Sequence, residues 1–120
     1  MSIEFESRVH ARHLELTCTG TYTLDTSLEV YTRAFEIAAR EGSSAILVDA
    51  RLVTGTPPTL MDRFRMGMHV GQLQSGPGKQ IRVALLWYEP MIHPQKFGEI
   101  IAKSRGGQAR VFTDLDEAMA

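Results

Sequence analysis

The sequence predicts a single α/β domain: a mixed, mainly parallel sheet that begins with an antiparallel hairpin and carries helices on both faces. The chain opens with alternating polar and apolar residues, which is typical of a hairpin. Apolar, strand-like runs then alternate with segments of helical periodicity, and this order implies parallel strands joined by right-handed crossovers. No repeat, linker or low-complexity segment divides the 120 residues, so we expect one domain spanning 1–120.

The hairpin comes first. Apolar residues alternate with polar ones from Ile3 to Val9 and again from Leu14 to Cys18, with a polar break at 10–12. Such alternation predicts strands with one packed face and one wet face. Cys18 falls on the packed side, so we expect its thiol to be inert core.

The first helix is expected from Leu24 to Glu41. Its apolar residues recur at helical spacing: Leu28, Tyr31, Phe35 and Ala38. Thr23 or Thr26 can cap its start, and Thr26 with Glu29 matches a capping box. Gly42 suits the left-handed position that ends a helix.

The remaining elements keep the alternation of strand and helix. In order they are a strand at 45–48, a helix at 60–73 after Pro57-Pro58, a long central strand at 81–88, a helix starting at Pro94, a strand at 108–112 and a terminal helix capped by Thr113 or Asp114. The continuous apolar run at 45–48 indicates a strand that is covered on both faces.

The composition excludes several classes of function. The 13 basic and 14 acidic residues are interspersed and leave a net charge of −1, so no charged block favours nucleic acid or a membrane surface. The longest apolar run, 83–88, is too short to span a bilayer, and the N-terminus lacks a signal-peptide pattern. The single cysteine fits a reducing compartment. We therefore expect a cytoplasmic protein.

No metal site or cofactor is expected. The 4 histidines are scattered over hairpin, helix and loop without a ligand pair at helical spacing: His10, His13, His69 and His93. The glycine-rich stretch 75–80 lacks the phosphate-loop pattern and precedes a strand, so it is predicted to be a turn.

The candidate binding site lies where the predicted strands end. In open α/β sheets, ligands and partners meet the protein outside the carboxyl ends of the strands. The candidates that follow the strands at 45–48 and 81–88 are Asp49, Arg51, Thr54, Thr56, Trp87, Tyr88 and His93.

Each candidate also has a structural interpretation. Asp49 and Arg51 could bind a ligand, but an ion pair that braces the following loop is favoured. Trp87 could line a pocket or pack over the end of the sheet. Glu89 and His93 could form an acid–base pair, yet no nucleophile motif accompanies them. We therefore predict no catalytic residue.

The helix at 60–73 carries two apolar strips. The strip suited to pack on the sheet consists of Leu60, Met61, Phe64, Met68 and Gly71. The second strip, Met66, Val70 and Leu73, is expected to be exposed, because a surface helix needs only one. An exposed strip favours an interface, and Gly67 and Gly71 would allow a close approach, so we expect a homodimer through it. The alternative is that the preceding loop or the next helix covers the second strip.

The order of elements resembles the SpoIIAA-like branch of the STAS superfamily. The resemblance is carried by Leu47-Val-Asp-Ala-Arg51 on the third strand and by the ending Arg110-Val-Phe-Thr-Asp-Leu-Asp-Glu-Ala118. More narrowly, the chain resembles small bacterial STAS/SpoIIAA-like proteins without an assigned role. The resemblance spans nearly the whole chain and implies that fold and a regulatory or protein-binding role.

The resemblance also implies where a regulatory switch would lie. STAS domains that antagonise anti-sigma factors carry a phosphorylatable serine in an Asp-Ser-Ser-Gly stretch just after the third strand. The corresponding stretch here is Leu52-Val-Thr-Gly-Thr-Pro-Pro58, where Thr54 and Thr56 provide the only hydroxyls. We therefore expect no phosphorylation switch.

We conclude from the sequence that the protein is a non-enzymatic regulatory or protein-interaction module of the STAS/SpoIIAA-like kind. We expect a homodimer, a possible protein partner, no cofactor, no nucleic acid and no membrane insertion. The alternative is a domain that binds a small apolar or anionic molecule at the C-terminal edge of the sheet. A deep pocket at the strand ends would favour the alternative, and a filled edge beside an apolar helix surface would favour the interaction module.

Overall fold

The computed structural model describes residues 3–75, 81–88, 91 and 109–113. The elements are β1 (Ile3–Val9), β2 (His13–Thr21), α1 (Leu24–Glu41), β3 (Ala45–Thr54), α2 (Leu60–Ser75), β4 (Arg82–Leu86) and β5 (Ala109–Phe112). The predicted turn at 75–80, the predicted helix from Pro94 and the predicted terminal helix fall wholly or mainly on residues outside this description.

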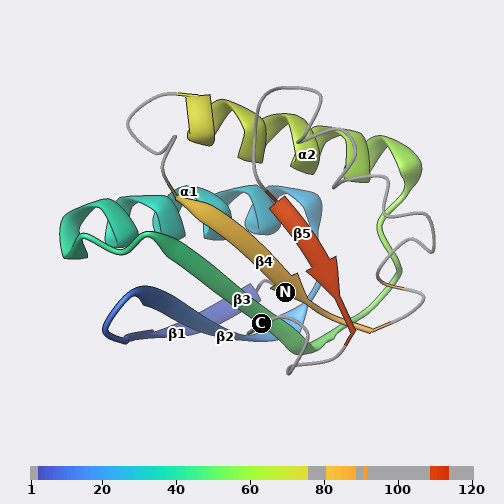
Figure 1. Cartoon of the computed structure of the whole chain (residues 1–120). Coiled ribbons are helices and arrows are strands. Elements are labelled where there is room, and N and C mark those ends of the chain that lie inside the picture. The colour runs from blue at the N-terminus through green and yellow to red at the C-terminus, as the bar shows by residue number, and fades with distance from the viewer. Residues whose placement is uncertain (1–2, 76–80, 89–90, 92–108, 114–120) are drawn as a thin grey trace.

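A five-stranded sheet in the order β1-β2-β3-β4-β5 supports α1 and α2 (Figure 1). β1 and β2 are antiparallel, and the other neighbouring strands are parallel. The predicted mixed, mainly parallel α/β sheet with an N-terminal hairpin is thus confirmed. The prediction that 81–88 forms the central strand is wrong, because β3 lies in the middle. The crossovers through α1 and α2 both advance the sheet in the same direction, and right-handed crossovers of this kind place their helices on the same face.

The hairpin and α1 begin and end close to where the sequence predicts. Thr23 is the N-cap of α1, since its hydroxyl accepts the N–H of Thr26 at 3.3 Å. Gly42 ends the helix with φ of +71°, and Ser43 donates its N–H to Ala38 O at 2.9 Å. Of the two predicted caps, Thr23 is therefore the one used.

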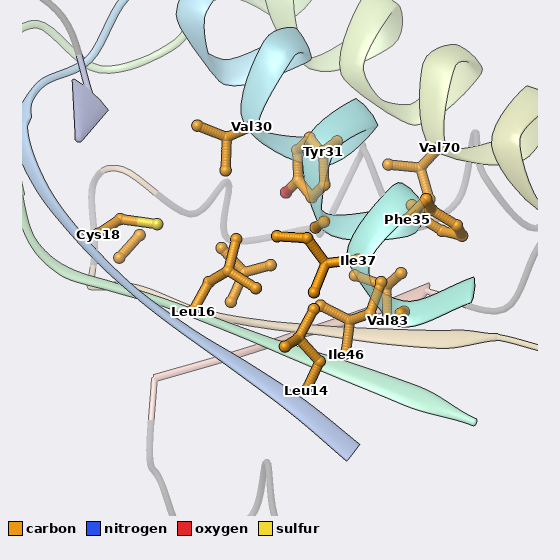
Figure 2. Packing of buried hydrophobic residues seen from close by; sticks show 14 of the residues in the cluster. Leu14, Leu16, Cys18, Val30, Tyr31, Phe35, Ile37, Ile46, Val70 and Val83 are labelled. Carbon is orange, nitrogen blue, oxygen red and sulfur yellow. The ribbon is translucent and has the colours of Figure 1, made fainter. Parts of the chain in front are cut away.

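The main core lies between the sheet and the two helices (Figure 2). Its residues on the sheet include Leu14, Leu16, Cys18, Ile46, Val48 and Val83, and those on α1 include Tyr31, Phe35 and Ile37. The prediction that Cys18 is inert core is confirmed. It is 2% exposed, and burial, followed by the charge of Asp49, raises the pKa of its thiol to about 12.

The predicted orientation of α2 is wrong. Val70 is 4% exposed and belongs to the core, and Met66 and Leu73 pack against it. Conversely, Leu60 and Met61 are 60% and 59% exposed. The strip Met66, Val70 and Leu73 therefore faces the core, and it is not the exposed surface that the predicted dimer requires.

Polar residues at buried positions explain this error. Arg63 and Gln74 lie on the inward side of α2 and are buried. The Arg63 guanidinium donates to Met91 O at 2.7 Å, and the Gln74 amide donates to Ile81 O at 2.9 Å. Buried polar groups that are hydrogen-bonded in this way are tolerated, but they interrupt the apolar pattern from which a packed face is recognised.

Candidate functional site

The candidate site is the edge where the parallel strands end. β3 continues to Thr54, but its pairing with β4 stops at Asp49 and Leu86. The last residues of β3 therefore need hydrogen-bond partners other than β4. The structure brings Asp49, Arg51, Thr54, Trp87 and Tyr88 to this edge, whereas Glu89 and His93 lie outside the described residues.

A β-bulge interrupts β3 at this edge. Thr17 pairs with Asp49 and Thr19 pairs with Leu52, so β3 has one more residue than β2 across the same interval. The additional residue shifts the alternation, and Leu52 becomes exposed while Val53 returns to the core. A bulge leaves ladder groups without a strand partner, and these must bind elsewhere.

Asp49 provides a partner for the bulge. Its Oδ1 accepts the backbone N–H of Arg51 at 3.1 Å and the Nε–H at 3.0 Å, and its Oδ2 accepts Nη2 at 2.8 Å. The guanidinium bonds, which outweigh burial, hold the pKa of the Asp49 carboxyl below 3.8. The Asp49 side chain is 11% exposed, while that of Arg51 is 48% exposed. The carboxylate is thus committed to the fold, and the guanidinium still reaches solvent.

Trp87 and Tyr88 take the place of a strand beside the end of β3. The Trp87 Nε1–H and the Tyr88 hydroxyl both donate to Val53 O at 3.0 Å. Trp87 is buried, and its backbone N–H donates to Phe112 O at 3.0 Å. Trp87 therefore packs over the end of the sheet, which is the structural one of the two interpretations that the sequence offers.

Tyr22 connects this edge to the start of α2, a role that the sequence analysis missed. Its N–H donates to Thr54 O at 2.8 Å, and its ring centroid lies 5.8 Å from that of Trp87. The Tyr22 hydroxyl donates to Asp62 Oδ2 at 3.2 Å. Asp62 also forms a capping box with Thr59, since each residue's side chain accepts the other's N–H. Thr59 with Asp62 before an apolar run is the signal that could have revealed this cap.

The loop after β3 presents its hydroxyls to solvent. Thr54 and Thr56 are exposed, and the Thr54 hydroxyl donates to Gly20 O at 3.4 Å. Gly55 between them has φ of +115°, a conformation that favours glycine. The conformation of this loop therefore depends on its backbone, with glycine between the two threonines.

The space beneath the edge is small. A cavity of about 30 Å³ lies between the sheet and the helices, lined in part by Cys18, Tyr31, Val53, Met66 and Trp87. This is room for a molecule of the size of water, whereas ligand pockets usually hold roughly 300–1,000 Å³.

The described residues offer no metal centre at this edge or elsewhere. Within 3–75, 81–88, 91 and 109–113, no group of three or more histidine, cysteine, aspartate or glutamate side chains is arranged to hold a metal ion. No helix in the described part of the chain has the length and apolar character needed to cross a membrane.

Comparisons with known proteins place the fold. No protein-family model and no curated protein matches the chain. The crystal structure of an anti-sigma factor antagonist from Mycobacterium paratuberculosis is similar, with a TM-score of 0.59 and 13% identity over 98% of this chain and 92% of that chain. An uncharacterized protein from the DUF3478 family with a SpoIIAA-like fold, from Shewanella loihica PV-4, is 20% identical over 98% of this chain and 91% of that chain, with a TM-score of 0.49.

A likeness at this level of identity concerns the fold, and function has to be argued from the site. The strand order, the antiparallel hairpin and the two crossover helices agree with the fold expected from the sequence. The chain therefore shares the α/β fold of that anti-sigma factor antagonist.

Proposed function

We propose that this protein is a non-enzymatic regulatory module that binds another protein through the C-terminal edge of its sheet and the first turn of α2. The filled edge is the observation that carries the proposal. Trp87 and Tyr88 cover Val53 O, and the cavity beneath is about 30 Å³. Within the part of the chain that the structure describes, such an edge presents a surface rather than a pocket.

Exposed apolar side chains lie next to this filled edge. Leu60 and Met61 begin α2, and Tyr22 ties that turn to the end of β3 through Asp62. Apolar side chains gathered beside polar ones are typical of protein interfaces, and the half-exposed guanidinium of Arg51 adds a charged contact. A protein partner would contact both the exposed apolar side chains and the guanidinium.

The small-molecule alternative has less support. A ligand that is bound in a pocket usually buries most of its surface, which requires several hundred cubic ångströms. The described cavity falls far below that volume. An anionic ligand held by Arg51 alone would remain mostly in solvent, because the Arg51 side chain is itself half-exposed. The guanidinium would bind it weakly, because it is already paired with Asp49.

The proposal also covers the biological role of the protein, its compartment and its self-association. The similar fold of a protein named as an antagonist of an anti-sigma factor supports a regulatory role in bacteria. The buried thiol of Cys18 fits a reducing compartment, so we place the protein in the cytoplasm. We also propose that it self-associates, although through a surface other than α2.

Site-specific photo-crosslinking in the source cells tests the proposal. A photoreactive amino acid replaces Met61 in one version and Glu36, an exposed residue of α1, in the control. We expect one identifiable protein to be crosslinked from position 61 and not from position 36. A small molecule retained in stoichiometric amount by the purified protein, together with no specific crosslink, would overturn the proposal in favour of the ligand-binding alternative.

A further inference from the structure

β1 is an edge strand whose outward backbone groups can be identified. Among the described strands it pairs with β2 alone. His10 donates its N–H to His13 O at 2.9 Å, which marks that pair as hydrogen-bonded. Hydrogen-bonded pairs alternate along an antiparallel ladder, so the even-numbered residues of β1 direct their amides and carbonyls toward β2. The amides and carbonyls of the odd-numbered residues therefore point to the open edge.

The side chains of β1 differ between its two faces. Phe5 packs against the core, and Val9, on the same face by alternation, is 48% exposed. Glu4, Glu6 and Arg8 are exposed on the opposite face. Charges on an edge strand usually discourage pairing with another chain, unless their signs match across the new pair.

We propose that β1 pairs antiparallel with β1 of a second copy of this chain, about a twofold axis at Ser7, so that one continuous sheet crosses the dimer. In this register Ser7 faces its own copy, Phe5 faces Val9 of the second copy, and Glu6 faces Arg8 of the second copy. The inference supplies the surface for the self-association proposed above. It does not involve the C-terminal edge.

Backbone direction and charge together select this register. Only registers that bring odd-numbered residues opposite odd-numbered residues let the outward amides meet outward carbonyls. Among those centred from Glu4 to Arg8, a centre at Glu4, Glu6 or Arg8 places that residue opposite its own copy, and like charges meet. A centre at Phe5 places Glu4 opposite Glu6 of the second copy. The centre at Ser7 brings no like charges together and pairs Glu6 with Arg8 twice.

The same register also covers the exposed apolar side chain. Val9 of each copy lies across from Phe5 of the other, and apolar cross-strand pairs stabilise sheets. The contact uses the same surface on both copies and is closed by symmetry, so it ends at a dimer. One strand pair buries less area than a standard interface, and we therefore expect dissociation in the micromolar range.

Charge exchange across the twofold axis tests the inference. Glu6→Arg and Arg8→Glu each place like charges opposite one another in a homodimer. When the two variants are mixed, every facing pair has opposite signs. By analytical ultracentrifugation we expect the unmodified protein to dimerise, each variant alone to dimerise at least tenfold more weakly, and the mixture to recover a dimer containing one copy of each.

Two further variants keep the test decisive. Glu36→Arg makes the same charge change on α1, away from β1, and is expected to dimerise like the parent. Ser7→Pro removes an N–H that points away from β2, so the monomer keeps its ladder and folds while the dimer is lost. A parent that is monomeric at high micromolar concentration, a mixture that stays monomeric, or undiminished dimerisation of Ser7→Pro would each overturn the inference. None of these outcomes alters crosslinking from position 61, so the proposed function is tested separately.

Discussion

Asp49 and the bulge in β3 lead to a quantitative expectation. Asp49→Ala removes the acceptor that holds the Arg51 N–H at 3.1 Å and both contacts to its guanidinium. Because the Arg51 side chain is 48% exposed, water can solvate the released guanidinium at little cost. The bond from the Arg51 backbone N–H is part-buried, and a buried donor left without a partner costs about 1–3 kcal/mol. We expect the free energy of unfolding to fall by about that amount.

The assay is equilibrium unfolding in urea, followed by the fluorescence of the single tryptophan, Trp87, which is buried. Asp49→Asn is the matched variant, since its amide oxygen can still accept the Arg51 N–H. We expect Asp49→Asn to lose about 1 kcal/mol, less than Asp49→Ala.

The pH dependence of stability separates the contribution of the Asp49 charge from that of the shape of its side chain. The folded-state pKa of Asp49 is lowered from 3.8, so its stabilising contribution is present above that value and is lost as the pH falls below it. The stability difference between the parent and Asp49→Asn should therefore be constant between about pH 5 and 7 and narrow below about pH 4. An Asp49→Ala protein of undiminished stability that loses its function in cells would refute the bracing role and restore the ligand-binding interpretation.

Four other substitutions test the remaining contacts by the same unfolding assay. Val70→Glu buries a charge in the core and should cost several kcal/mol, whereas Met61→Glu on the exposed side should change stability by about 0.5 kcal/mol or less; equal effects would contradict the assigned faces of α2. Burial lowers the pKa of His69 below 6.5, so stability should fall as the pH drops below that value, and His69→Gln should abolish this slope. Gly55→Ala places a Cβ 3.0 Å from Thr21 Cγ2 at φ of +115° and should cost about 1–3 kcal/mol; an unchanged midpoint would argue against a strained loop.

The predictable parts of this fold are those specified by neighbours in the sequence. The β1–β2 hairpin follows from strict alternation, and α1 follows from its apolar spacing and from Gly42 at its end. Each of these signals requires only residues within one turn or one strand pair. The boundaries of both elements accordingly agree with the expectation to within a few residues.

The features that were not predicted depend on contacts between distant segments. Whether Arg63 and Gln74 lie inside depends on the carbonyls of Met91 and Ile81, which only the folded chain brings near them. The bond from Tyr22 to Asp62 likewise joins the residue that follows β2 to α2. The helical spacing of apolar residues marks such polar positions as solvent-facing. The sequence therefore predicts the wrong face of α2 as the packed one.

The bulge in β3 also lets the strand hold one residue more than its neighbour across the same interval. Ile46, Val48 and Ala50 alternate into the core, and Val53 rejoins them only because one additional residue intervenes. A deletion of either residue at 51–52 would restore regular pairing and leave Val53 opposite Gly20 and facing the core, whereas a slip of the pairing by one residue would turn every later side chain of the strand to the other face. The bulge therefore adds one residue to the solvent-facing edge of the sheet without moving the core position that follows it.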